Sequence, residues 1–201
     1  MNKRIDYYFS VISPWTYLGS ARIEQIAARH GASIHPMPVE FGRIFPATGG
    51  LPLAKRAPER QKYRMMELIR WRDFLGVQLN LQPKFFPAVE RQAALVTVAA
   101  RQAHGDGAAL KLAHAILRGV WVGEANIADP AGLEGLIGAA GLDGAALMKA
   151  AQHADVAAAY DADTEAALRR GVFGAPTYAY RDELFWGQDR LEFVDRAVAR
   201  G

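Results

Sequence analysis

Ser13 is the residue whose type and position most directly suggest chemistry. It follows the apolar segment 7–12 and precedes Pro14, and a serine followed by a proline is a favoured start for a helix. A helix N-terminus offers unpaired N–H groups and about half a positive charge, which together stabilise an anion. Ser13 is therefore either a plain helix cap or part of a place that holds a reactive, negatively charged group.

The reactive side chains elsewhere in the chain narrow that chemistry. The 201 residues include no cysteine, which excludes disulfides, thiolate nucleophiles, zinc-thiolate sites and dithiol redox reactions. Any sulfur chemistry must come from a bound thiol. The five histidines share no motif, so we interpret them as structural or surface residues and expect no metal site.

The element pattern places Ser13 between a strand and a helix. We expect a short buried strand over residues 4–12 and a helix over 14–30 that ends at Gly31. A second strand over 33–41 would be parallel to the first if the helix between them is a right-handed crossover. The first fifth of the chain therefore predicts a βαβ unit.

The middle of the chain predicts a helical block. Residues 42–58 are rich in Gly, Pro and basic residues and read as a mobile surface loop, 58–76 as a helix, and 77–87 as an extended loop. Alanine-rich segments separated by Gly, Asp and Asn follow, and each is expected to be a helix. These segments are 88–104, 107–122, 129–141, 143–151 and 153–171.

The end of the chain returns to strands. Residues 176–180 and 184–186 predict a β-hairpin, and 189–200 predict a helix capped by Asp189. The order of elements is therefore βαβ, then helices, then ββα.

A βαβ half and a ββα half make a thioredoxin-like α/β fold, here with a large all-helical insertion. The thioredoxin-like domain would comprise residues 1–41 and 172–201, and the loop and helical insertion 42–171. In that arrangement the N-terminus of the first helix is the reactive position. Pro176, in "GAPT", stands where such a fold holds a cis-proline against that terminus.

The composition of the chain limits the classes of partner that it could bind. Hydrophobic residues make up 51% of the chain and charged residues 22%, which is typical of a globular protein. The net charge of +3 comes from basic residues spread along the chain, so we expect no nucleic-acid partner. We find no apolar run long enough to span a bilayer and no signal peptide, and therefore expect a cytoplasmic protein without a membrane partner.

Three motifs in a fixed order carry a family resemblance. They are S-P-aromatic-x-Y-L in "YYFSVISPWTYLG", V-F-G-x-P-T in "GVFGAPT" and W-G-x-D-R in "FWGQDRLEFV". With them, the chain resembles the 2-hydroxychromene-2-carboxylate isomerases and the related kappa-class glutathione transferases over nearly its full length. The resemblance implies a DsbA-like fold, glutathione as the cofactor and a homodimer.

The resemblance also implies a glutathione site. Ser13 would stabilise the thiolate, and the backbone of Ala175, before Pro176, would pair with the cysteinyl part as an added strand does. Asp189 and Arg190 would hold the γ-glutamyl end, because a carboxylate accepts from an ammonium and helix N–H groups suit a carboxylate. Without the resemblance, Asp189 is equally an ordinary cap and Arg190 a solvated surface charge.

Aromatic and basic residues are candidates for binding a substrate beside the thiol. The aromatic candidates are Trp15, Tyr17, Phe85, Phe86 and Trp121. We favour ordinary core packing for Tyr17 and Trp121, and it is an open alternative for Trp15. The candidates to meet a glycyl or substrate carboxylate are Lys55, Arg56 and Lys62, for which a solvated basic surface is an equal alternative.

The implied activity is a glutathione-dependent isomerisation of 2-hydroxychromene-2-carboxylate to trans-o-hydroxybenzylidenepyruvate in aromatic degradation. The thiolate would add to the ring system, the ring would open, a bond would rotate, and elimination would release the product. A kappa-class transferase acting on electrophilic aromatics is one alternative. A noncatalytic thiol- or peptide-binding module is another.

Two positions depart from the family pattern. Ser10 stands where the family usually has an aspartate at the end of the first strand, and Gly50 stands where relatives often have an asparagine. These departures bear on the support around Ser13 and on the binding of glutathione and substrate.

Overall fold

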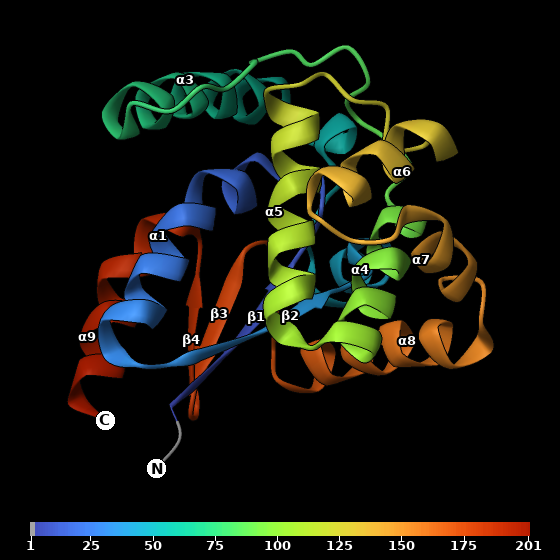
Figure 1. The fold of residues 1–201 in the computed structure, drawn as a ribbon. Coiled ribbons are helices and arrows are strands. Elements are labelled where there is room, and N and C mark those ends of the chain that lie inside the picture. The colour runs from blue at the N-terminus through green and yellow to red at the C-terminus, as the bar shows by residue number, and fades with distance from the viewer. Residues whose placement is uncertain (1–2) are drawn as a thin grey trace.

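Within residues 3–201, which the computed structural model describes, four strands form a mixed sheet. The strands are β1 (Arg4–Phe9), β2 (Ser33–Pro38), β3 (Thr177–Tyr180) and β4 (Glu183–Trp186). Their spatial order is β2-β1-β3-β4, with β1 and β2 parallel and the other two pairs antiparallel. The expected βαβ and ββα halves are therefore confirmed, and they meet along β1 and β3 (Figure 1).

The first helix begins and ends as its sequence predicts. α1 (Pro14–His30) has Ser13 as its N-cap, and it ends at Gly31, whose φ of 59° places it in the left-handed region. Glycine adopts that conformation without the steric cost that a Cβ would add. The chain then enters β2 directly, which makes α1 the crossover between two parallel strands.

The last helix differs from the expectation at its start. α9 (Leu191–Arg200) follows a 3-10 turn, η2 (Gln188–Arg190), and its N-cap is Arg190, which makes no side-chain capping bond. The prediction that Asp189 caps this helix is wrong. The Asp189 carboxylate lies inside the 3-10 turn and pairs with the Arg190 guanidinium at 2.8 Å instead of accepting from the helix.

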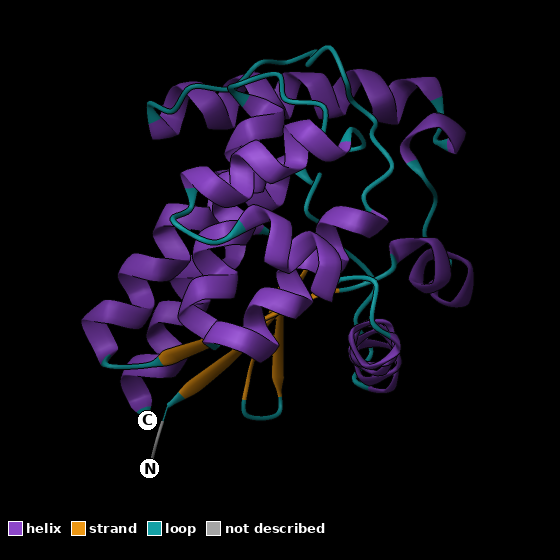
Figure 2. Ribbon diagram, turned by 45° about the vertical axis from the view of Figure 1, so that its right-hand side comes forward, coloured by secondary structure: helices purple, strands orange, loops and turns teal. Residues whose placement is uncertain are grey.

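The predicted helical block is present, with each helix within a few residues of its expected bounds. Its members are α3 (Pro58–Leu75), α4 (Arg91–His104), α5 (Asp106–Trp121), α6 (Pro130–Ala139), α7 (Gly144–Ala150) and α8 (Ala154–Arg169). Figure 2 shows these helices around one end of the sheet. Among the described residues, no helix is both long and apolar enough to cross a membrane.

The segment 42–58 is not the irregular loop that its composition predicts. It contains α2 (Phe41–Thr48) and a short 3-10 helix, η1 (Leu53–Lys55). Phe41 and Ile44 are buried against α8 and the sheet, and this burial stabilises a short helix despite the proline within it. Tertiary packing therefore overrides the local Gly and Pro signals.

The two faces of the sheet are buried by different helices. Alternate β1 residues Ile5, Tyr7 and Phe9 pack into the main core with α1, α5 and α9, whereas Tyr8 packs with α2 and α8 on the opposite face. The main core continues from the strands into α4, α5, α6 and α7. The insertion and the sheet therefore share one core. The division into two domains stays a prediction.

Candidate active site

The turn between β1 and α1 fixes Ser13. Its backbone N–H donates to the carbonyl of Ser10 at 3.2 Å, and its Oγ accepts from the N–H of Thr16 at 3.3 Å. Because Oγ is the acceptor in this cap, the hydroxyl proton remains available to a ligand. The first turn of α1 contains no acidic residue, so no side chain there neutralises its positive end.

The segment before β3 forms the opposite wall. The Ala175–Pro176 peptide bond is cis, as expected, and Pro176 is buried. The Thr177 hydroxyl donates to the Gly174 carbonyl at 2.7 Å, and the Gly187 N–H donates to the Pro176 carbonyl at 2.8 Å. Within residues 3–201, no hydrogen bond engages the N–H or C=O of Ala175, so this peptide segment presents free backbone groups.

Ser13 and Ala175 line the same cavity, which has a volume of about 1350 Å³. Its walls come from the β1–α1 turn, α2, η1, α3, the loop before α4 and the segments flanking β3 and β4. Pockets for drug-sized ligands usually measure about 300–1,000 Å³, so the volume of this cavity exceeds what one small ligand needs.

The aromatic candidates divide between the cavity and the core. Trp15 and Phe86 line the cavity. Trp121 is fully buried behind Phe86, with ring centroids 4.8 Å apart, which confirms core packing for this tryptophan. The structure places Phe85 outside the cavity lining, where Lys84 lies 5.2 Å from its ring centroid. Tyr17 also lies outside and donates to the Gln78 carbonyl at 2.8 Å.

Sequence reasoning missed six further aromatic residues of the cavity lining, including Phe41, Tyr63 and Trp71. Phe45, Phe173 and Trp186 line the cavity. The Phe173 and Trp186 rings lie 4.8 Å apart, and Trp186 packs so closely on Gly174 that a Cβ there would collide with the indole. A Cβ on Gly50 would likewise collide with the Phe45 ring. Glycine at position 50 therefore makes room for an aromatic ring.

Of the three basic candidates from the sequence, Arg56 lines the cavity and the two lysines do not. Lys62 is exposed and outside the lining, as is Lys55, because the helical turn of α3 directs position 62 toward solvent. Arg56 lines the cavity, together with Arg60 and Arg64 from α3. The spacing of four residues between these two arginines, continued by Glu67 and Trp71, is the sequence signal that identifies this face of the helix.

Arg64 is the most enclosed of these cations. Its guanidinium carbon lies 5.6 Å from the centroid of the Phe86 ring, and it forms no ion pair with any carboxylate of the described residues. Burial and the neighbouring charge of Arg56 lower the pKa of Arg64 to about 10, so it stays charged at neutral pH. A partly buried, unpaired guanidinium is suited to binding an anion.

Asp189 and Arg190 both line the cavity, on the side of η2. Their side chains form an ion pair with each other at 2.8 Å, and both are partly solvent-exposed. The preceding Gly187 has a φ of 100°, and a Cβ there would collide with the Asp189 carboxylate. The conformation of this glycine therefore allows Asp189 to turn back toward the cavity.

Glu90 lines the cavity, although no sequence motif marks it as a site residue. The Ser10 hydroxyl donates to Glu90 Oε2 at 2.6 Å, and the backbone N–H groups of Val11 and Ile12 also favour the charged carboxylate. Burial is nevertheless the largest influence and raises the pKa of Glu90 to about 7. The contact also accounts for Ser10, because the carboxylate absent from position 10 is supplied from the start of α4.

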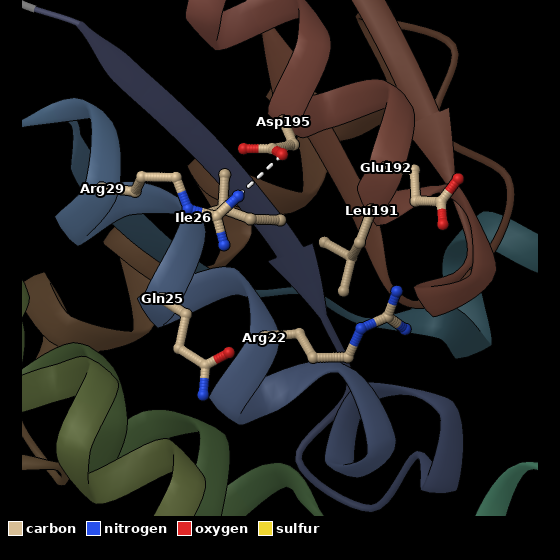
Figure 3. A pocket seen from close by; sticks show the side chains of 7 residues that line it. All are labelled: Arg22, Gln25, Ile26, Arg29, Leu191, Glu192 and Asp195. Atoms are coloured by element: carbon tan, nitrogen blue, oxygen red, sulfur yellow. Dashed lines mark hydrogen bonds and ion pairs between the residues drawn. The ribbon is translucent and has the colours of Figure 1, made fainter. Parts of the chain in front are cut away.

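A second, smaller hollow lies between α1 and α9 and holds about 190 Å³ (Figure 3). Arg29 and Asp195 form an ion pair of 2.8 Å across it. Arg22 donates to the carbonyl of Gln188 at 3.0 Å, which ties α1 to η2. These contacts join two helices and bring no nucleophile together with a base. Among residues 3–201, no group of three or more His, Asp or Glu side chains is arranged to hold a metal ion.

Comparison with known proteins agrees with this architecture. The model of the DSBA-like thioredoxin domain matches residues 4–199. A 2-hydroxychromene-2-carboxylate isomerase of Sphingobium xenophagum is 31% identical over 196 residues, covering 97% of each chain. The solved structure of a 2-hydroxychromene-2-carboxylate isomerase superposes with a TM-score of 0.80 at 25% identity, covering 98% of this chain and 95% of that one. A glutathione S-transferase kappa 1 of Caenorhabditis elegans is 29% identical over 89 residues, 44% of this chain and 39% of the transferase.

Glu90 should make the stability of the protein depend on pH. Between pH 4.5, its ordinary pKa, and about pH 7, the folded state keeps a proton that the unfolded chain releases, so stability falls as pH rises. The pKa difference corresponds to about 3 kcal/mol. Glu90→Gln should remove this loss, so its stability relative to wild type should increase across the window.

Urea unfolding of both proteins at pH values from 4 to 8 measures the difference, since all other titrating groups are shared. Parallel stability curves for wild type and Glu90→Gln would contradict the assignment.

Proposed function

The chain belongs to the 2-hydroxychromene-2-carboxylate isomerase family of DSBA-like thioredoxin domains, and we propose that it is a glutathione-dependent isomerase. Its proposed substrate pair is 2-hydroxychromene-2-carboxylate and trans-o-hydroxybenzylidenepyruvate. The observation that carries this proposal is one cavity that is lined by a helix-capping serine, a free peptide segment and an enclosed arginine. The proposed location is the cytoplasm, where reduced glutathione is maintained.

The donor set on one side of the cavity fits glutathione. The N-terminus of α1 and the Ser13 hydroxyl suit a thiolate, and the unengaged N–H and C=O of Ala175 suit an extended peptide. Asp189 offers a carboxylate to an α-ammonium, and Arg190 offers a cation to an α-carboxylate. The three chemical features of a γ-glutamyl tripeptide thiol therefore each have a partner.

The other side of the cavity fits an aromatic carboxylate. Trp15, Phe86 and Trp71 supply apolar surface, and Arg64 supplies an enclosed cation. A guanidinium binds a carboxylate through two parallel hydrogen bonds, which fixes orientation as well as adding affinity. We assign to Arg64 the role of binding the substrate carboxylate, a role for which the sequence favoured Lys62.

Each residue of the site has a separate role in the proposed reaction. Bound glutathione supplies the thiolate nucleophile that makes this a covalent mechanism. Ser13 and the α1 N-terminus stabilise the negative sulfur and lower the pKa of the thiol. Trp15 and Phe86 hold the aromatic ring and exclude water, while Arg64 holds the carboxylate so that the unsaturated carbons face Ser13.

A kappa-class glutathione transferase is the second candidate. The Phe45 ring fills the place beside Gly50, which makes this wall better suited to an apolar electrophile. The two activities differ in what leaves the site. An isomerase releases its product and free glutathione, whereas a transferase accumulates a glutathione conjugate, so mass spectrometry of the reaction mixture separates them.

The first prediction concerns the hydroxyl of Ser13. Ser13→Ala should lower the glutathione-dependent isomerisation rate by about 10- to 100-fold, because a hydrogen bond to a charged group is lost. Isomerisation is followed by absorbance with and without glutathione, with the exposed Ser33→Ala as a matched control. Equal rates in the absence of glutathione would contradict the mechanism, and an unaffected Ser13→Ala would contradict the role of the hydroxyl.

The second prediction tests whether Arg64 or Lys62 binds the substrate carboxylate. Arg64→Met should raise the KM for the carboxylate substrate by about 10- to 100-fold through loss of a charge-assisted hydrogen bond. Lys62→Met, on the same helix but outside the cavity, should change it less than about twofold. Steady-state kinetics at saturating glutathione give both values. The reverse order of effects would reassign the carboxylate to Lys62.

The third prediction concerns a homodimer, which the family resemblance implies. α3 exposes the large apolar side chains Met66, Ile69 and Phe74, together with Tyr63 at the edge of the cavity. We propose that this face contributes to the dimer. Phe74→Glu should then convert the dimer to a monomer in sedimentation velocity, while Phe193→Glu on α9 should not. A wild type that sediments as a monomer, or a Phe74→Glu dimer, would refute this.

A further inference from the structure

Glu90 is a carboxyl in the cavity that the binding roles above leave unused. It lies immediately before α4 and reaches the turn that carries Ser13, where the Ser10 hydroxyl donates to it at 2.6 Å. Ser10, Ile12, Ser13 and Glu90 all line the cavity, so the carboxyl borders the same space as the thiolate-stabilising hydroxyl.

The proposed reaction requires one internal proton transfer. In 2-hydroxychromene-2-carboxylate, one carbon carries both a hydroxyl group and the ring oxygen. Opening the ring breaks the bond from that carbon to the ring oxygen, turns the hydroxyl group into a ketone and leaves a phenol. The proton of the hydroxyl group must therefore move to the ring oxygen, with no net gain or loss of protons. A group that both donates and accepts a proton near neutral pH serves this step.

We propose that Glu90 is the acid–base group of the isomerase, which protonates the ring oxygen as its bond to carbon breaks and recovers a proton from the hydroxyl group. The neutral carboxyl gives its proton to the leaving phenolate oxygen. The resulting carboxylate then accepts the proton of the hydroxyl group as the ketone forms, so Glu90 returns to its starting state. This inference rests on the proposed function.

The other carboxyls of the cavity lining are less suited to this role. Glu67 pairs with Arg70 at 2.5 Å, which lowers the pKa of Glu67 and favours its charged form. Asp189 is already engaged by Arg190 at 2.8 Å, and Glu59 is exposed to solvent. Glu90 forms no ion pair among the described residues. A neutral hydroxyl and backbone N–H groups hold it, so it is able to exist in both protonation states near pH 7.

The groups around Glu90 shift its pKa in opposite directions. The Ser10 bond favours the charged form and lowers the pKa, while the nearby negative charge of Glu40 raises it. Glu40 itself pairs with Arg91 at 3.4 Å, and Arg91 lies over the Tyr160 ring. Burial, Glu90 and Glu40 raise the pKa of Tyr160 well above its ordinary value, so this phenol stays neutral.

The first test needs neither glutathione nor substrate. Carboxyl carbon chemical shifts, compared between wild type and Glu90→Gln, assign the Glu90 titration in the free protein by NMR. We expect its midpoint near pH 7, an upward shift in Ser10→Ala and a downward shift in Glu40→Gln. A midpoint below pH 5 in wild type would overturn the proposal, because the carboxyl would then hold no proton to donate.

The second test is kinetic. Glu90→Gln should lower kcat by about 100-fold or more and abolish the ionisation near pH 7 in the kcat profile, while the Kd for glutathione stays within about twofold. The amide still accepts hydrogen bonds from the turn, and circular dichroism verifies its fold. In Ser10→Ala and Glu40→Gln, the kinetic ionisation should move in the same directions as the NMR midpoints. The exposed Glu192→Gln is the matched control.

The outcomes separate the two proposals. An active, glutathione-dependent wild type whose pH profile survives in Glu90→Gln would overturn the acid–base role and leave the isomerase function standing. A wild type without isomerase activity would overturn the proposed function, and the acid–base role with it. A lower kcat in Glu90→Gln with an unchanged pH profile would reduce Glu90 to a positioning residue and also contradict the proposal.

Discussion

The open N-terminus of α1 is the constraint on which the site depends, because its unpaired N–H groups attract an anion only while no side chain neutralises them. Distant parts of the chain hold the turn before it. Glu90 accepts a hydrogen bond from the Ser10 hydroxyl, and the buried Trp121 donates its indole N–H to the Ile12 carbonyl at 3.2 Å. The helical block therefore contributes to the position of Ser13 from α4 and α5, as well as enclosing the cavity.

The cavity combines two environments that are seldom compatible. Free backbone groups and a paired Asp and Arg lie on the side of β3 and η2, whereas on the side of α3 Arg64 lies against the Phe86 ring. A polar tripeptide and an aromatic anion each find complementary chemistry, and the space between them lies beside Ser13. The low polarity around Arg64 strengthens its attraction for a carboxylate, at the cost of removing a cation from water.

The pattern of the sequence determined most of the scaffold. The serine cap and Gly31 delimit α1, hydrophobic segments locate both strand pairs, and the motif before β3 identifies Pro176 as the opposite wall. These features are local, so residues adjacent in sequence decide them. Two predictions were wrong. The chain forms a 3-10 turn over Gln188–Arg190, in which Asp189 pairs with Arg190 instead of capping α9. Burial of Phe41 and Ile44 stabilises the helix α2 where the composition predicts a loop.

The sequence by itself determined a thioredoxin-like fold with a hydroxyl where a thiolate would bind, because capping, periodicity and the absence of cysteine are properties of the linear chain. Only the tertiary structure decided which side chains share the cavity. Arg64 replaces Lys62 because the turn of α3 selects which basic residue faces inward. Glu90 meets Ser10 across 80 positions of sequence, and its raised pKa arises from burial, which exists only once the chain has folded.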